Sequence, residues 1–448
     1  MITLPWFKIF LPQTLTLLLC GSLVLQTRRQ SVGFSTLKSF EPNQLKIILL
    51  LFVLVAVTSV VQTMQIPEHA DLYPLLNWSG RNTPYFKSIT QLLWMFVGIG
   101  AFIASLAVLK NEKQVGLAVK TLIYGQAITA ALSVVQIAGY ALDLRFINTA
   151  FRGITVLSDL DSGRVIRAHS VFTEPSHLAV FHAMALPLVL GLRYKGKSLI
   201  VPLILFSFLM TFSRSMMLMT GSLTALFLLS GLRTKGKQRI RSLFILIFCL
   251  LGFELVSRAI FHTSLVEIFS GQFSSFGDTN NFSNYQRLIS MQAAFDIFLK
   301  HPILGVGIGN YAFHIASVAN PEDLPNIMPI AGNFFLELLC ETGILGLGAL
   351  LLFLVKVRNY VTEARQWTQK TFFRNDAQVL TLLLMGFYVM LIGFFTFSAF
   401  FFPFVWVYLA IMLAAARSVQ ATGYSDSVSR LKEKQNSYPH KDFRRPQL

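Results

Sequence analysis

Charged residues are scarce in this sequence of 448 residues. Asp, Glu, Lys and Arg together make up 13%, whereas about a quarter is usual in a soluble domain. Apolar residues make up 54%, and Phe alone occurs 41 times. These values exclude soluble globular, disordered and collagen-like chains. Long apolar runs with few charges must cross lipid as helices, so the composition predicts an all-α polytopic membrane protein.

Cysteine is also rare. The three cysteines, Cys20, Cys249 and Cys340, all lie inside apolar runs. This placement excludes a disulfide framework and gives no indication of a zinc site. We therefore expect no metal centre, and the function must come from other side chains.

Apolar runs of near-membrane length predict about eleven transmembrane helices, or twelve if a short further span lies in a loop. The eleven candidates lie at about 10–26, 44–62, 90–109, 116–139, 176–192, 198–213, 215–232, 242–257, 331–355, 377–393 and 395–414. The sixth and seventh are separated only at Ser213-Arg214-Ser215, which predicts a tight hairpin.

The charges alternate from one connection to the next. The connections after spans 1, 3, 5, 7 and 9, with the tail after span 11, hold 27 of the 38 Lys and Arg residues but only 7 of the 21 acidic residues. This is the positive-inside pattern, so the basic side is predicted to be cytoplasmic. The net charge of +17 thus reflects topology and not a nucleic-acid surface. An odd number of spans places the N-terminus outside and the C-terminus inside.

The predicted organisation has four parts. Residues 1–257 hold helices 1–8 with an outer loop at about 140–175, and residues 258–330 form a large extracytoplasmic loop. Residues 331–420 hold helices 9–11, and 421–448 form a basic cytoplasmic tail that we expect to be disordered. The large loop contains an amphipathic helix, because Leu288, Met291, Phe295 and Phe298 recur at helical spacing before Pro302.

The outer loop before span 5 is the first candidate for chemistry. It carries Arg164, Arg167, His169, Glu174 and His177 within 14 residues, on the side that has few positive charges. Arginine binds phosphate in bidentate geometry, and a carboxylate can accept a hydroxyl proton. A solvated loop with internal ion pairs explains the composition equally well.

Two further arginines are candidates. Arg214 lies at the outer end of the hairpin between two apolar spans, where it either reaches lipid headgroups or points into a cavity. Arg287 lies in the first turn of the amphipathic helix, where a cation opposes the helix dipole. That mismatch mildly favours an anionic partner, although a surface arginine without a partner explains it slightly better.

The entry to span 9 carries two carboxylates, Glu337 and Glu341. The charge-free run from Gly343 to Val355 has 13 residues, or roughly 20 Å of helix, which is too short for a hydrocarbon core of roughly 30 Å. The span must therefore include both carboxylates in its outer half, where such groups usually face a cavity or a cation. A shallow entry within the headgroup zone is the alternative.

Gly305-Val-Gly307-Ile-Gly309-Asn310 resembles a nucleotide-binding glycine string, but no strand precedes it. A tight turn that returns the loop to the membrane is the preferred interpretation. A backbone nest for a phosphate is the secondary one.

The order of these motifs resembles the O-antigen ligase/polymerase superfamily of bacterial envelope glycosyltransferases. The resemblance rests on Arg287, then His301-Pro302-Ile-Leu-Gly305-Val-Gly307-Ile-Gly309, and then Asn333 followed after nine residues by Gly343-Ile-Leu-Gly346. Upstream, Arg167 followed by Glu174-Pro175, and Ser213-Arg214 at the start of a span, fit the same pattern. The likeness covers most of residues 40–415.

The resemblance implies a substrate oligosaccharide carried on undecaprenyl diphosphate at the outer face of the inner membrane, with no cofactor or metal. An acceptor sugar hydroxyl attacks the anomeric carbon, and the lipid diphosphate leaves. Arg167, Arg214 and Arg287 would then hold the diphosphate, Glu174 would accept the proton, and Glu341 would position the arginines. We also expect Arg164, His169, Asn333 and Gly307 to contact substrate, and a flippase and a chain-length regulator are the implied partners.

One position departs from the family pattern. The ligase branch has a His directly before the Asn, and this chain has Gly332. The resemblance therefore favours the polymerase branch, which joins lipid-linked repeat units into O-antigen or exopolysaccharide. A ligase that transfers glycan to an acceptor such as lipid A-core stays open, because His169, His177 or His314 could replace that His. A transporter of lipid-linked glycans is the distant alternative, since no internal repeat is visible.

Overall fold

The computed structural model describes residues 43–59, 61–62, 84–144, 146–147, 155–157, 165–229, single positions between 251 and 270, and 282–320, 322–370, 374–396 and 402–436. This part of the chain is mostly helical. Its elements, in chain order, are α2 (Asn43–Ser59), α3 (Pro84–Val108), α4 (Glu112–Ala141), β1 (Thr155–Leu157), β2 (Val165–Arg167), α6 (Pro175–Gly191), α7 (Lys197–Leu209), α8 (Arg214–Leu229), α11 (Phe282–Lys300), α12 (Tyr311–His314), the short 3₁₀ helices Ile315–Ser317 and Leu324–Asn326, α13 (Phe334–Lys370), α14 (Arg374–Gly393) and α15 (Pro403–Asn436).

The chain is a multi-pass membrane protein. Five helices are long and apolar enough to cross a bilayer, namely Pro84–Val108, Glu112–Ala141, Phe334–Gln369, Asp376–Gly393 and Pro403–Gln420. Lys46–Ser59, Pro175–Gly191 and Lys197–Leu209 are apolar but shorter. Nine of the expected spans overlap a helix, and most of their ends differ from the helix ends by a few residues. The exceptions are 331–355 and 395–414, since α13 extends to Lys370 and α15 runs from Pro403 to Asn436. The first and eighth expected spans, 10–26 and 242–257, lie outside the described residues apart from isolated positions.

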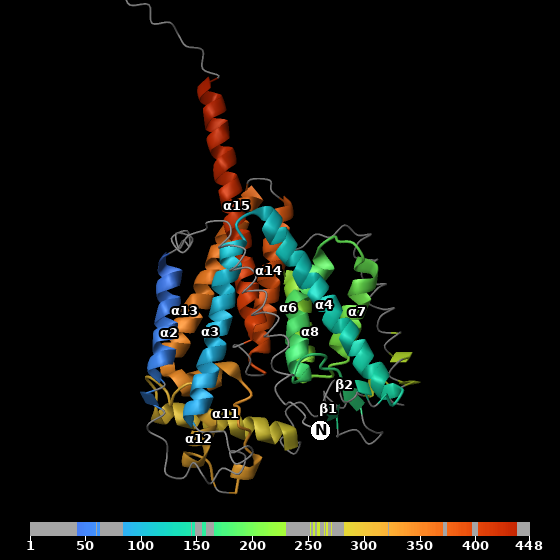
Figure 1. The fold of residues 1–448 in the computed structure, drawn as a ribbon, viewed down its shortest axis with the longest axis vertical. Coiled ribbons are helices and arrows are strands. Elements are labelled where there is room, and N and C mark those ends of the chain that lie inside the picture. Colours follow the sequence, from blue (N-terminus) through green and yellow to red (C-terminus); the bar gives the residue numbers. More distant parts are fainter. Residues whose placement is uncertain are drawn as a thin grey trace, which may run out of the picture.

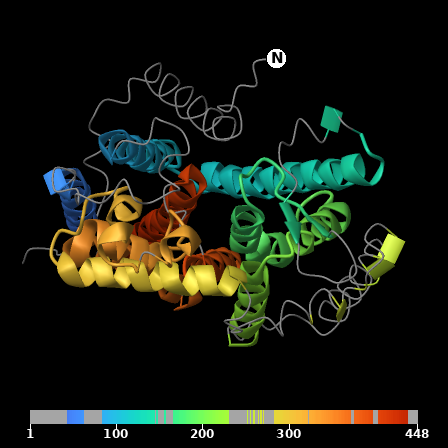
Figure 2. The ribbon, with the colours of Figure 1, turned by 90° about the horizontal axis from the view of Figure 1, so that it is seen from below.

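The long helices stand side by side, and α11 lies across one end of them (Figure 1). One group contains α2, α3, α13 and α15, and a second contains α4, α6, α7 and α8. α14 joins the two, because it packs against α13 and α15 on one side and against α6 and α8 on the other. We call the end that α11 covers the α11 end of the bundle. Figure 2 shows α11 running from the first group toward α8.

The core of the bundle is aromatic and tightly packed. Trp406 and Phe353 are fully buried and lie with Phe102 in one cluster, at ring-centroid distances of 5.8 to 6.1 Å. The buried Tyr408 hydroxyl donates to the Leu383 carbonyl at 2.8 Å, as a buried phenol must to offset its desolvation. Many large apolar side chains on the outer faces of the helices are instead exposed, among them Leu50 (67%) and Leu93 (59%). Such faces suit contact with lipid tails.

α13 is broken near its start, a feature that the sequence did not predict. Gly343 has φ 64° and ψ −170°, which no helical residue adopts. The side chains of Glu337 and Glu341 lie before the break and are 6% and 2% exposed. The expectation that this span includes both carboxylates is therefore consistent with the structure.

The last helix corrects one expectation. The sequence predicted an irregular tail from 421, but α15 continues as a helix through Asn436. The segment contains Lys, Glu, Arg and Gln, which favour helix almost as strongly as Ala does. The apolar half of α15 is already helical in the bundle, so its helix extends outward without a new nucleation step.

Candidate functional site

The site forms where four segments meet at the α11 end of the bundle. The first is the short hairpin of β1 and β2, in which Thr155 pairs with Arg167. The chain leaving β2 is tied to the turn between α7 and α8, because the Ala168 N–H donates to the Met210 carbonyl at 2.8 Å. The Arg167 Nε donates to the Thr211 carbonyl at 2.9 Å. These bonds fix one face of the Arg167 guanidinium against the turn.

The next turn is held by a side chain from α4. The Gln136 Oε1 accepts from the N–H groups of both His169 and Ser170, at 3.1 and 3.0 Å. Ser170 adopts φ 52°, an unfavourable backbone conformation for a residue with a side chain. The His169 ring is buried, and its Nδ1 lies 2.9 Å from the Phe172 carbonyl. His169 thus belongs to the framework of the turn, and the expected substrate contact stays a prediction.

Glu174 follows this turn and precedes α6. It occupies the N-cap position with extended backbone, and Pro175 begins the helix, as is common at the first helical residue. The Glu174 side chain is exposed and accepts a hydrogen bond from the Ser176 hydroxyl at 3.1 Å. In the first turn of α6, the His177 Nδ1 lies 3.1 Å from the Thr173 hydroxyl.

Arg214 begins α8, directly after the turn from α7. The Ser213 hydroxyl accepts from the Met216 N–H at 3.0 Å and so caps this helix. The Arg214 guanidinium donates to the Asn284 side-chain oxygen in the first turn of α11. That bond connects the turn between α7 and α8 to the helix that carries Arg287.

The three arginines and Glu174 form one electrostatic cluster, which we call the arginine cluster. Burial lowers the pKa of Arg167 to about 10, and repulsion from Arg287 and Arg214 adds to this effect while Glu174 opposes it. Burial also lowers the pKa of Arg287, and Glu174 again opposes the change. A pKa near 10 still leaves Arg167 protonated at neutral pH. The cluster of three arginines and one glutamate therefore has a net positive charge, which suits a polyanionic ligand.

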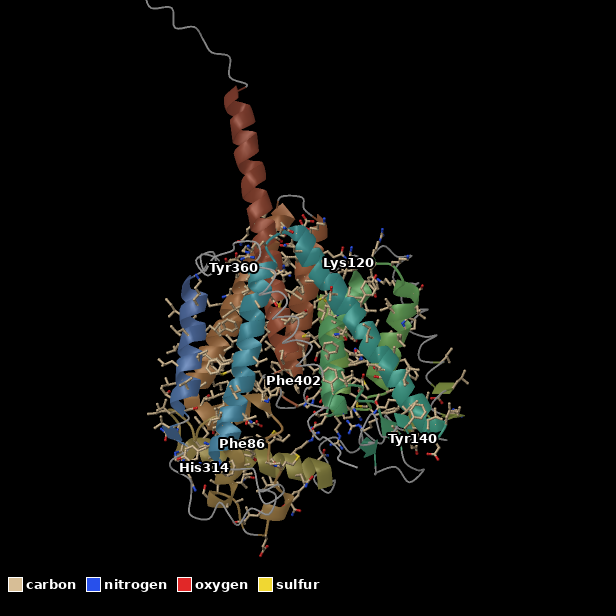
Figure 3. The ribbon with its side chains drawn as sticks, viewed as in Figure 1. Phe86, Lys120, Tyr140, His314, Tyr360 and Phe402 are labelled. Carbon is tan, nitrogen blue, oxygen red and sulfur yellow. The ribbon has the colours of Figure 1, made fainter. Side chains whose placement is uncertain are left out.

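A group of packed aromatic rings contacts His177, close to Glu174 in the sequence. The Phe402 ring packs edge-on to His177 at 4.8 Å and stacks on Phe404 at 5.5 Å. Phe404 in turn packs against Phe172 and Phe181. Figure 3 shows Phe402 toward the end of the bundle where Phe86 and His314 also lie, away from Lys120 and Tyr360.

Two expected site residues, Asn333 and Glu341, have partners within the protein. Asn333 caps α13, because its side-chain oxygen accepts from the N–H groups of Phe335 and Leu336 at 3.0 and 3.2 Å. Glu341 does not join the arginines. Its side chain accepts from the backbone of Tyr311 at 3.3 Å and of Gly309, so the expectation that it positions the arginines is not supported.

The glycine string is a structural turn. Its N–H groups have protein acceptors, since Val306 and Gly307 donate to the carbonyls of Cys340 and Glu341, each at 2.9 Å. The Ile308 N–H donates to the Ser59 hydroxyl at 3.2 Å. These bonds leave no free nest for a phosphate, so Gly307 is part of the framework. Arg164 lies outside the described residues.

Gln136, Asn284 and Phe402 were missed by the sequence reasoning. Gln136 did give a signal, because an amide within the apolar run at 116–139 must find a partner. Asn284 gave none, since a polar residue at the start of a surface helix is ordinary. Among the described residues no group of three or more His, Cys, Asp or Glu could hold a metal ion.

Comparison with known families adds one match. Residues 199–351 match the family described as O-antigen ligase. The matched segment includes Arg214, Arg287 and the break in α13. The resemblance to the O-antigen ligase/polymerase superfamily is thereby confirmed. No curated protein matches the chain.

Proposed function

Since residues 199–351 match the O-antigen ligase family, we propose that this chain polymerises oligosaccharide repeat units carried on undecaprenyl diphosphate. The product would be O-antigen or an exopolysaccharide. The observation that carries the proposal is the arginine cluster, in which four segments bring three cations and one carboxylate together at the end of an apolar bundle. A lipid-linked diphosphate has its tail in the bilayer, so its charged group lies at the membrane surface, where the end of the bundle also lies.

The chemistry follows from these side chains. Glu174 accepts the proton from an acceptor sugar hydroxyl, and the hydroxyl oxygen forms a bond to the anomeric carbon of the donor. The bond from that carbon to the phosphate oxygen breaks, and its electron pair leaves with the diphosphate. Arg167, Arg214 and Arg287 stabilise the charge that develops on the leaving group, which is commonly the largest single contribution to catalysis. No protein nucleophile is required.

The charge distribution supports an outward-facing site in the inner membrane. Lys113 and Arg193 lie at the helix ends opposite to α11, and Arg358 lies in the second half of α13. By the positive-inside rule that end is cytoplasmic, so the α11 end faces the periplasm or the cell exterior. Lipid-linked repeats reach this face only after transfer across the membrane. A flippase and a chain-length regulator are therefore the proposed partners.

Position 332 supports polymerisation over ligation. Gly332 has φ 68°, and a Cβ added there would lie 4.0 Å from the Arg287 Cγ. The histidine that the ligase branch has at this position would thus border the arginine cluster, and this chain has no side chain there.

A ligase is the second candidate, because the matched family is described as O-antigen ligase. His177 is the histidine that favours it, since this side chain interacts electrostatically with Glu174.

Substitution of the arginines tests the proposal. In a strain that lacks the protein, Arg214→Ala and Arg287→Ala should fail to restore polymer, at normal protein levels in the membrane. Arg358→Ala is the matched control, since this arginine is exposed and donates to the Tyr388 hydroxyl, away from the cluster. The control should restore the full ladder on a glycan gel. Full-length polymer made by either cluster variant would rule out the diphosphate role.

A further inference from the structure

The break in α13 is closed by a distant segment of the chain. The backbone from 302 to 307 crosses the break and hydrogen-bonds on both sides of Gly343. The Ile344 N–H donates to the Pro302 carbonyl at 2.9 Å, and the Leu345 N–H donates to that of Ile303 at 3.4 Å. In return, Val306 and Gly307 donate to α13 carbonyls before the break. The backbone groups that the break exposes are therefore satisfied, as burial in lipid requires.

Only glycine fits at the crossing. A Cβ at Gly343 would collide with the Ile303 carbonyl, and one at Gly305 would collide with the backbone of Glu341. Both glycines also have positive φ, 64° and 69°, which is unfavourable for other residues. The two backbones thus pass each other at a distance that no side chain permits.

The same segment is attached to two further helices. The Ile308 N–H donates to the Ser59 hydroxyl at the end of α2. The buried Ser88 hydroxyl of α3 donates to the Asn310 side-chain oxygen at 3.1 Å, and the Asn310 side-chain N–H donates back to Val306 at 3.1 Å. We call residues 302–310 with these contacts the glycine clamp. It fixes the chain that leaves α11 to α2, α3 and α13 together.

α11 therefore has three points of attachment. Its C-terminal end runs through His301 directly into the glycine clamp. Its middle is bonded to α12, since the Tyr311 hydroxyl donates to the Ser290 carbonyl at 2.8 Å. Its first turn meets Arg214 through Asn284. Figure 2 shows α11 running along the first helix group, with one end near α8.

We propose that the glycine clamp sets the position of α11 and thereby delivers Arg287 to the arginine cluster, so that Gly305 and Gly343 are positioning residues for diphosphate binding. This inference rests on the proposed function. Arg167 and Arg214 are fixed by the turn between α7 and α8, whereas Arg287 comes from an element anchored on the other helix group. A displacement of about 1 Å at a reacting group can cost about a hundredfold in rate.

The test measures binding of farnesyl diphosphate, a short soluble polyprenyl diphosphate, to the full-length protein in lipid nanodiscs. Gly343→Ala should weaken binding about tenfold, because the clamp must shift to admit the methyl group. Gly348→Ala is the matched control in the same helix, since an added Cβ there meets nothing within 4 Å. The control should bind as the unsubstituted protein does.

A double substitution separates positioning from general damage. If Gly343 acts through Arg287, Gly343→Ala should have almost no further effect on binding in an Arg287→Ala background. A loss of the same size in both backgrounds would show a merely structural role and overturn the inference. Unchanged binding by folded Gly343→Ala would overturn it too.

The remaining outcomes distinguish the two proposals. If Arg287→Ala itself binds farnesyl diphosphate normally, the diphosphate site fails and the inference fails with it. If Arg287→Ala weakens binding and Gly343→Ala does not, only the inference fails. Ser88→Ala is the milder clamp variant should Gly343→Ala not fold. It removes one buried hydrogen bond and should weaken binding by about two- to fivefold, and unchanged binding would again count against the inference.

Discussion

At the scale of single residues, Glu174 has the charge and the placement of a general base. It interacts electrostatically with Arg167 and Arg287, yet its side chain remains exposed to an incoming hydroxyl. Glu174→Gln keeps the shape but removes the ability to accept a proton. Chain extension should fall by about 10² to 10⁴, the usual contribution of general acid–base catalysis.

Quantified glycan gels from complemented cells measure this effect. Glu322→Gln changes another exposed carboxylate, in the segment after α12, and serves as the control. Near-normal extension by Glu174→Gln would assign the proton to a different acceptor, with His177 the first to test.

His314 predicts a pH dependence of stability. It is 2% exposed, its Nε2 has no hydrogen-bond partner, and burial together with the neighbouring His301 lowers its pKa to about 4. Because the folded protein resists protonation that the unfolded chain accepts, the free energy of unfolding should fall as the pH drops from about 6.5 toward 4.

Thermal unfolding of the purified protein between pH 7.5 and 4.5 checks this prediction, with His314→Phe as the comparison. The variant should lose less stability on acidification, since it has no imidazole to protonate. His301 and Lys300 are present in both proteins, so a difference between the two proteins reports on His314. Equal loss in the two proteins would exclude His314 as the cause.

At the scale of elements, the turn before α6 depends on one amide from α4. Gln136→Leu fills the same space but leaves the N–H groups of His169 and Ser170 without an acceptor. Each unsatisfied buried group costs about 1 to 3 kcal/mol. We expect lower thermal stability and reduced chain extension, because the turn holds Arg167 and Glu174 in register.

Gln292→Leu is the comparison, since this glutamine is exposed on α11. It should leave both thermal stability and extension near normal. Wild-type stability in Gln136→Leu would show that the turn at His169 and Ser170 does not depend on Gln136.

Elements were predictable where a local pattern determines them. The apolar runs located nine helices, although the ends of α13 and α15 differ widely from the expected ones, and the period of Leu288, Phe295 and their neighbours gave α11. The glycine clamp could not be predicted, because it joins the backbone of Pro302 to that of Ile344, which is distant in the sequence. The backbone partners of Asn333 and Glu341 could not be predicted for the same reason, since only the folded chain brings those groups near. Their roles toward substrate stay predictions.

At the scale of the whole molecule, the account predicts which end of the bundle faces outward. Gln292→Cys on α11 and Lys113→Cys at the start of α4 are exposed at opposite ends. In a background without Cys20, Cys249 and Cys340, a membrane-impermeant maleimide should label position 292 in right-side-out vesicles. It should label position 113 only in inside-out vesicles, and the reverse pattern would overturn the topology.

The arginine set could be named from the sequence, because arginines on the poorly charged side of a membrane protein stand out. Their convergence could not, since it requires β2, α8 and α11 to meet. The polymerase proposal depends on one residue, Gly332, and its test is the glycan that the intact protein produces.

The most direct measurement is a gel of surface and lipid-linked glycans from a strain that lacks this protein. The account predicts single repeat units in place of a ladder, restored to a ladder by the intact gene but not by Arg287→Ala. Long glycan left on its carrier lipid would contradict polymerisation and identify a ligase. An unchanged ladder would contradict both.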